Sequence, residues 1–323
     1  MKRTKSPALL SLLFLIILSC GSSSEELPKE QPKIITDDFK LIAVSDRGNV
    51  FEIGNNTGAI TLTAAIEKES DATFLGTSSI TASADKIYAI EYIYNPLPTN
   101  NLLVFDRQNG TTQKIPLVLP STINGEERGI FALSWDNNNL IGILSENVLM
   151  NNSTKHLISI NLQDNSVTEL GISFNEDKVS SMKRINSKLY ISTWGEGFLI
   201  VDLDNKSVTH LSSINGSRLA AINNSELAIM QPVSGSLGGA KPGIIDLNTQ
   251  TVSDTSNGET FGLVTVFGNT IYKNGIYLNL VSSNRLNLYL GILKSTISTN
   301  TNSVVAINST NVNRNLIIIG TTN

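Results

Sequence analysis

The sequence predicts an all-β fold of many short strands, and three observations support this. From Lys40 onward, apolar runs of four to six residues alternate with clusters of Asn, Asp, Gly and Ser, without a helical period. The chain contains 36 Asn and 23 Gly residues, which belong in turns rather than in helix interiors. Similar strand-and-turn segments recur along the chain, which indicates a repeat.

Composition excludes several classes of protein. Of the 323 residues, 40% are hydrophobic and 16% are charged, which excludes an intrinsically disordered chain and a long coiled coil. The net charge of −4 argues against a nucleic-acid partner. His156 and His210 have no Cys, His or Asp at metal-ligand spacing, so we expect no metal and no cofactor.

The amino terminus has the features of a secretion signal. Lys2, Arg3 and Lys5 precede an apolar run at residues 8–18, which is too short to span a bilayer as a helix. The segment Ile17-Leu18-Ser19-Cys20 resembles the lipobox of bacterial lipoproteins. That resemblance implies a signal peptide at residues 1–19 and palmitate-type acylation of Cys20, which would anchor the protein to a membrane.

The residues after Cys20 are polar, so we expect a flexible tether over residues 20–37 and a single domain over residues 38–323. Loss of the three basic signal residues leaves a mature charge of −7. The Ser-Ser-Ser-Glu-Glu stretch at residues 22–26 resembles the export tag of surface-exposed lipoproteins. We therefore expect attachment to the outer membrane, with the outward-facing orientation favoured over the periplasmic one.

The repeat has two recurring pieces. One is a turn followed by an apolar strand, and it aligns at spacings of 38 to 53 residues on Leu41, Ile87, Leu140, Leu189, Leu227, Ile271 and Leu316. The other is a strand that ends in Asp or Asn, followed by a tight turn and a further strand, at residues 103–110, 158–166, 199–206 and 244–250.

Four-stranded units at this spacing are typical of a single β-propeller. The intervals predict six blades, with seven as the alternative, and residues 303–319 closing onto the amino-terminal blade. Residues 280–301 fit the repeat poorly. Residues 188–208 (KLYISTWGEGFLIVDLDNKSV) resemble the propeller repeats of two-component-regulator sensors and of PQQ-like domains. Those families share a fold and little chemistry, so the resemblance implies architecture alone.

In such blades the loops between strands 2 and 3, and the crossings between blades, emerge on one face. That face carries most of the large and charged loop residues, so we expect a ligand-binding surface there. The candidate ligand-binding residues are Trp194, Glu196, Tyr92, Tyr94, Glu127, Arg128 and Arg218. Alternatives remain, because Trp194 can instead pack between blades, and Glu127 and Arg128 can belong to a solvated loop.

These features predict a cell-envelope lipoprotein whose propeller is a binding or scaffold module for a glycan, a peptide or a partner protein. The alternative is a polysaccharide hydrolase or lyase that uses carboxylates, for which two carboxyl groups at a set separation suffice. Its candidate carboxylates are Glu127, Glu146, Glu196 and Glu259. A third hypothesis is a subunit of a larger envelope assembly. We assign no catalytic residue, and binding is favoured over catalysis.

Overall fold

The computed structural model describes residues 36–45, 47–69, 72, 79–93, 99–125, 127–136, 139–150, 152–176, 179–193, 195–232, 240–254, 264–267, 270–282, 285–296, 301–307 and 316–322. The chain divides into two units, Met1–Ile35 and Thr36–Asn323, and all of the described residues belong to the second. Cys20 and the signal region therefore lie outside the described residues. Within the described part, no helix is long and apolar enough to cross a membrane.

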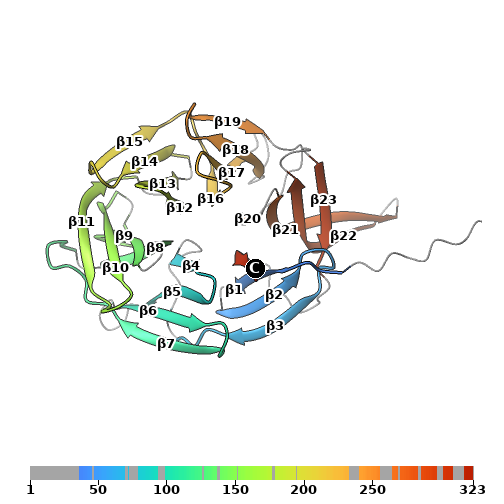
Figure 1. Cartoon of the computed structure of the whole chain (residues 1–323), viewed down its shortest axis with the longest axis horizontal. Coiled ribbons are helices and arrows are strands. Elements are labelled where there is room, and N and C mark those ends of the chain that lie inside the picture. Colours follow the sequence, from blue (N-terminus) through green and yellow to red (C-terminus); the bar gives the residue numbers. More distant parts are fainter. Residues whose placement is uncertain are drawn as a thin grey trace, which may run out of the picture. The chain divides into compact units, whose positions relative to one another are not determined.

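The described residues form 24 strands (Figure 1). The first twelve are β1 (Lys40–Ser45), β2 (Asn49–Gly54), β3 (Ile60–Ala65), β4 (Ile80–Ala82), β5 (Lys86–Ile93), β6 (Thr99–Asp106), β7 (Thr111–Pro116), β8 (Gly129–Asp136), β9 (Asn139–Ser145), β10 (Lys155–Asn161), β11 (Val167–Phe174) and β12 (Val179–Ile185). The others are β13 (Lys188–Thr193), β14 (Phe198–Asp202), β15 (Ser207–Leu211), β16 (Ser217–Ala221), β17 (Glu226–Pro232), β18 (Ala240–Asp246), β19 (Thr251–Asp254), β20 (Val264–Phe267), β21 (Thr270–Ser282), β22 (Arg285–Thr296), β23 (Thr301–Ala306) and β24 (Leu316–Thr321).

The strands form antiparallel sheets of four. Five sheets are blades made of consecutive strands, namely β4–β7, β8–β11, β12–β15, β16–β19 and β20–β23. A composite sheet has the order β24-β1-β2-β3 and so combines both ends of the domain. The first strand of each sheet contacts the first strand of the next, in the cyclic order β24, β4, β8, β12, β16, β20 and back to β24. The sheets therefore surround a centre (Figure 1).

This topology corrects the predicted blade organisation. In place of six or seven repeats, the chain forms five blades of consecutive strands, and the remaining four-stranded sheet is the composite of the two ends. Residues 303–319 do not close the ring as one segment, because β23 stays in the fifth blade and only β24 pairs with β1. Leu316 therefore lies in a first strand, whereas Leu41 and Leu189 lie in second strands.

The poor fit of residues 280–301 to the repeat has a structural cause. Strands β21 and β22 have 13 and 12 residues and pair from Thr270↔Thr296 to Ser282↔Arg285. The second and third strands of the other blades have five to eight residues. This hairpin thus extends beyond the repeat, and the spacing of apolar residues within it cannot follow the pattern of the shorter blades.

Burial on both sides of each sheet explains the continuous apolar runs. In β13, Leu189 and Ile191 pack in a core shared with the blade β8–β11, whereas Tyr190, between them, packs in a core shared with the blade β16–β19. Successive side chains of a strand point to opposite faces, and both faces here meet a neighbouring sheet. A strand in this position must be apolar at nearly every residue.

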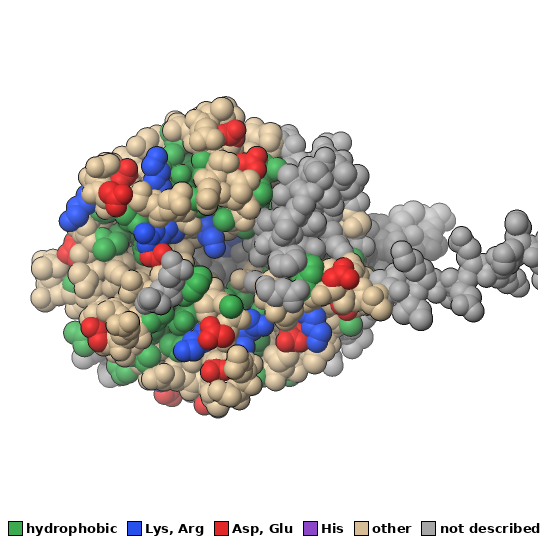
Figure 2. Space-filling model, viewed as in Figure 1, with side chains coloured by type: hydrophobic (Ala, Val, Ile, Leu, Met, Phe, Trp, Pro, Cys, Tyr) green, Lys and Arg blue, Asp and Glu red, His purple; other side chains and the backbone are tan. Residues whose placement is uncertain are grey.

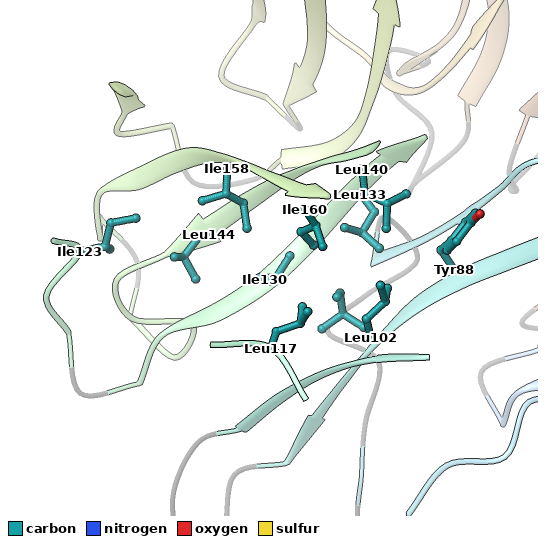
Figure 3. Packing of buried hydrophobic residues seen from close by; sticks show 11 residues of the cluster. Tyr88, Leu102, Leu117, Ile123, Ile130, Leu133, Leu140, Leu144, Ile158 and Ile160 are labelled. Atoms are coloured by element: carbon teal, nitrogen blue, oxygen red, sulfur yellow. The ribbon is translucent and has the colours of Figure 1, made fainter. Parts of the chain in front are cut away.

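One of these cores lies between the blades β4–β7 and β8–β11 (Figure 3). Leu102 of β6 belongs to one cluster with Ile130, Leu140 and Ile158 of the next blade, and all four side chains are 0% exposed. Full burial of one such side chain contributes roughly 1.5–3 kcal/mol to folding. The cores between sheets therefore fix each blade against the next, and they hold the loops at the two ends of the strands in place.

Candidate functional site

The strands end on two different faces. The turn face carries the hairpin turns at residues 83–85, 107–110, 203–206 and 247–250, which join strands 1 and 2 or strands 3 and 4 of the blades. The loop face lies at the opposite ends of the same strands. Its described segments include residues 117–125, 146–150, 195–197 and 212–216.

On the turn face, the turns between strands 3 and 4 satisfy their own polar groups. Asp202 Oδ1 accepts the backbone N–H groups of Asp204 (3.0 Å) and Asn205 (2.9 Å). Asp106 and Asp246 accept the N–H groups two and three positions later in the same way. These hydrogen bonds lower the pKa of all three carboxyls. Four such turns end in a left-handed residue: Gly110, Asn165, Lys206 and Gln250.

The loop face, by contrast, contains a buried charge near the end of β5. Glu91 has 0% side-chain exposure. Its Oε2 atom accepts hydrogen bonds from Lys114 Nζ (2.8 Å) and Asn101 Nδ2 (2.9 Å), and its Oε1 atom accepts the N–H of Glu69 (2.6 Å). Burial raises the pKa of this carboxyl, but the hydrogen bonds and the Lys114 charge outweigh burial, so the pKa lies below its ordinary value. The crossing before β4 is thereby tied to this blade.

Arg128, a predicted ligand-binding residue, makes hydrogen bonds within the loop face. Its Nη1 atom donates to the carbonyl oxygens of Pro120 and Ile123, both at 2.8 Å. Its own carbonyl accepts a hydrogen bond from Asn100 Nδ2 at 3.1 Å, and Asn100 Oδ1 accepts the N–H of Ile130 at 2.9 Å. The structure thus places Arg128 in the closure of the crossing from β7 to β8.

Arg218, a second predicted residue, lies at the loop-face end of β16. Its backbone is left-handed (φ 58°), and the β16–β17 register shifts between Ser217 and Ala220, which marks a β-bulge. The Arg218 Nη1 atom donates to the carbonyl oxygen of Ser180 at 3.1 Å. Burial lowers the pKa of this guanidinium to about 10. The side chain thus reaches from β16 to the start of β12.

Serine hydroxyls connect the three strands around Arg218. Ser181 Oγ accepts the N–H of Leu219 at 2.6 Å, which joins β12 to β16. Ser180 Oγ lies 2.8 Å from Ser192 Oγ of β13 and accepts the N–H of Arg218 at 3.4 Å. Ser192 is 0% exposed. This arrangement fixes the starts of β12 and β16, which are both first strands, at the inner edge of the loop face.

The other predicted residues have different surroundings. Tyr92 is 4% exposed, so its ring is not on the surface rim. Glu127 is half-buried and forms an isolated bridge with Asn147. Trp194 and Tyr94 lie outside the described residues.

Glu196 is also half-buried, and its carbonyl oxygen accepts a hydrogen bond from His210 Nε2 at 2.5 Å. Glu127, Arg128, Glu196 and Arg218 thus share the loop face. The described contacts do not join them into one cluster.

Sequence reasoning missed one group on the blade β8–β11. His156 Nε2 lies 2.9 Å from Glu146 Oε1, and His156 Nδ1 lies 3.3 Å from Glu169 Oε1. Thr122 Oγ1 donates to Glu169 Oε2 at 2.7 Å. The β10–β11 register shifts beside His156. Because of this shift, a regular strand spacing read from the sequence does not predict that Glu169 lies next to His156. Among the described residues, no cluster of His, Cys, Asp and Glu could hold a metal ion.

A cavity of about 320 Å³ opens between the blades β8–β11 and β12–β15. Its lining includes the ion pair of Arg184 Nη1 with Asp136 Oδ2, together with Glu169 and Lys206. The lining is thus balanced in charge, and Glu169 already contacts His156 and Thr122.

Comparison with known proteins defines a class of fold. No family model matches the chain, and no curated protein matches it. TolB from Acinetobacter baumannii is similar over 86% of this chain and 65% of its own length, with a TM-score of 0.55 and 14% identity. Puromycin hydrolase matches 83% of this chain and 43% of its own length (TM-score 0.51, 11% identity).

An oligogalacturonate lyase from Vibrio parahaemolyticus matches 84% of this chain and 78% of its own length, with a TM-score of 0.51 and 12% identity. The chain thus spans less than two thirds of the length of TolB and of puromycin hydrolase. At these identities the similarity concerns the fold alone. The protein is a β-propeller with four-stranded blades.

Proposed function

We propose that this protein is a lipid-anchored component of the cell envelope whose propeller binds a glycan, a peptide or a partner protein through its loop face. The observation that carries the proposal is the contrast between the two faces. The turn-face carboxylates Asp106, Asp202 and Asp246 are occupied by their own turns. The loop face is instead held by longer-range contacts, such as those of Glu91 and Arg128, which give a rigid surface.

Binding is preferred to the carboxylate-based hydrolase or lyase. That chemistry needs two carboxyl groups facing one substrate site. Of its candidate carboxylates, Glu146 contacts His156, Glu127 is in a bridge with Asn147, and Glu259 lies outside the described residues. Of the three described candidates, Glu127, Glu146 and Glu196, none lines the described cavity between β8–β11 and β12–β15.

A glycan array tests the binding proposal against many candidate ligands at once. The fragment that begins at Ile34 contains every described strand, and its two ends pair in one sheet, so it suits such an array. We expect retention of a defined set of glycans, and their loss when the loop face is blocked by an antibody raised against it. Absence of any retained glycan, together with no peptide or protein captured at the cell surface, would contradict the proposal.

The lipid anchor is proposed from Cys20 and has its own test. Wild-type protein expressed with labelled palmitate should carry the label and sediment with membranes, and Cys20→Ala should lose both properties. Proteinase added to intact cells should remove the domain if it faces outward. Membrane association of the Cys20→Ala variant at the wild-type level would contradict the anchor. If the domain resists proteinase in intact cells but is digested in lysed cells, its orientation is periplasmic.

A further inference from the structure

The six first strands, which contact one another around the centre, contain four charged residues: Asp136, Lys183, Arg184 and Arg218. Asp136 forms an ion pair with Arg184. The strands that surround the centre therefore carry two further positive charges and no further negative one. This local positive excess is opposite in sign to the net charge of the chain, which is −4.

The two cations lie on neighbouring strands. Lys183 belongs to β12 and Arg218 to β16, and these strands contact each other. The contacts of Arg218 and Leu219 with Ser180 and Ser181 set the register between the two strands. Lys183 is two residues beyond Ser181, so both cations lie along the same side of the centre, with Arg218 nearer to the loop face.

The side chains of Lys183 and Arg218 are each partly exposed and partly removed from water. Lys183 and Arg218 are half-buried, and burial lowers the pKa of both groups. Met182, which precedes Lys183, packs in the core shared with the blade β8–β11, and Ile185, two residues after Lys183, packs in the core shared with the blade β16–β19. Because alternate side chains share a face of the strand, Lys183 lies on the face of β12 that is turned to β16. The remaining accessible surface of a first strand faces the centre. On the face of the molecule that Figure 2 shows, Lys and Arg side chains lie near the centre.

The backbone of Arg218 also indicates a functional constraint. Left-handed backbone is uncommon for a residue other than Gly, Asn or Asp, and such residues gather at binding and catalytic sites. Here the strain accompanies the β-bulge that directs the guanidinium to the start of β12. A residue chosen only to form a strand would avoid this conformation.

We propose that Arg218 and Lys183 form an anion site at the centre of the propeller, open to the loop face, which binds a carboxylate or phosphoryl group of the ligand. This inference rests on the proposed binding function. The planar fork of a guanidinium fits carboxylate and phosphate, and an ammonium adds a compact charge. Because the protein as a whole is acidic, the site selects a single anionic group rather than a polyanion.

The test is calorimetric titration of the full-length protein in detergent with sodium glucuronate, with inorganic phosphate, and with glucose as the neutral control. We expect glucuronate or phosphate to bind and glucose not to bind. The stronger of the two anions identifies a carboxylate or a phosphoryl ligand. Loss of one charge-assisted hydrogen bond should weaken the binding by about tenfold or more in Lys183→Met and in Arg218→Asn.

The variants are chosen to preserve the fold. Asn tolerates the left-handed backbone of position 218, and Met replaces Lys183 with a side chain of similar length. The matched controls are Lys188→Met and Arg107→Asn, which remove the same charges from the turn face. They should bind as the wild type does.

The inference is overturned if the wild type binds neither anion, or if Lys183→Met binds as tightly as the wild type. Failure of the inference is distinguishable from failure of the proposed function. An array ligand that binds both variants with wild-type affinity refutes the anion site alone. Anion binding that depends on Lys183 and Arg218, with no glycan, peptide or protein ligand found, refutes the proposed function alone.

Discussion

Glu91 is a carboxylate with no exposed surface, and it stays ionised because hydrogen-bond donors surround it. Removal of a carboxylate from water is costly, and only good partners compensate for that cost. Lys114 supplies an opposite charge at 2.8 Å, while Asn101 and the N–H of Glu69 supply neutral donors. These donors come from β6, β7 and the crossing before β4, so one side chain fixes three segments of the loop face.

Substitution of Glu91 by Gln should lower the free energy of unfolding by about 1–3 kcal/mol at pH 7, because a neutral amide replaces the charged acceptor beside Lys114. Urea unfolding followed by tryptophan fluorescence measures the change. The control is Glu52→Gln, since Glu52 pairs with Lys40 at the surface, where the side chains are 28% and 47% exposed. An exposed pair contributes less than about 1 kcal/mol. Equal losses in the two variants would contradict the role of Glu91.

The difference in stability between wild type and Glu91→Gln should depend on pH. Folding lowers the pKa of Glu91, so its ionisation stabilises the folded state fully above the unfolded pKa of about 4.3. That stabilisation is lost as the pH falls through the folded pKa. The difference in unfolding free energy between wild type and Glu91→Gln should therefore be largest near pH 7 and shrink below about pH 4.3. An unchanged difference at pH 3 would show that shape rather than charge matters here.

Among the secondary-structure elements, those governed by local chemistry were predictable. The Asp at the end of a third strand caps its own turn, as Asp106 and Asp202 show, and this depends only on neighbours in sequence. The four-stranded repeat follows from the same turns. The pairing of residues 316–319 with the amino-terminal blade was predicted, but the place of β24 as a first strand was not. First and second strands are both buried on two faces, so Leu316 has the same apolar surroundings in sequence as Leu189.

The site was less predictable than the turns, for a related reason. Arg128 and Arg218 both lie at the loop face, but the partners of Arg128 are the carbonyls of Pro120 and Ile123, and a carbonyl has no sequence signature. The left-handed backbone of Arg218 depends on a register shift between β16 and β17. Lys183 was not among the predicted residues, because a single Lys within a strand has no sequence signature of a site, and only the cyclic contact of the first strands gives it a place at the centre.

For the whole molecule, the composite sheet makes the fold closed. The N–H of Thr322 donates to the carbonyl of Lys40 at 2.9 Å, so the last described residue is bound to the first strand. Ile318 of β24 and Ile307, just after β23, pack in one core with Leu41. Closure therefore joins the fifth blade to both ends of the domain. Pairing between segments so far apart in sequence carries a larger loop-closure entropy than pairing between neighbouring strands.

Gly58 gives a direct test of that closure. It lies in the β2–β3 turn with φ 65°, and a Cβ atom there would lie 1.9 Å from the carbonyl oxygen of Ala306, at the end of β23. Gly58→Ala thus adds left-handed strain of about 1–2 kcal/mol and an overlap with backbone of about 1–3 kcal/mol, so we expect a loss of about 2–5 kcal/mol. The measurement is urea unfolding at pH 7.

Gly195→Ala separates the two effects. Gly195 is also left-handed (φ 85°), but a Cβ atom there meets no atom within 4 Å, so only the strain of about 1–2 kcal/mol should appear. The excess loss in Gly58→Ala then measures the contact between the composite sheet and the fifth blade. Because that contact helps to close the ring, the composite sheet of the Gly58→Ala variant should also be cleaved by a protease before the other blades are. Equal losses in the two variants, with uniform proteolysis, would show that closure at this point does not stabilise the propeller.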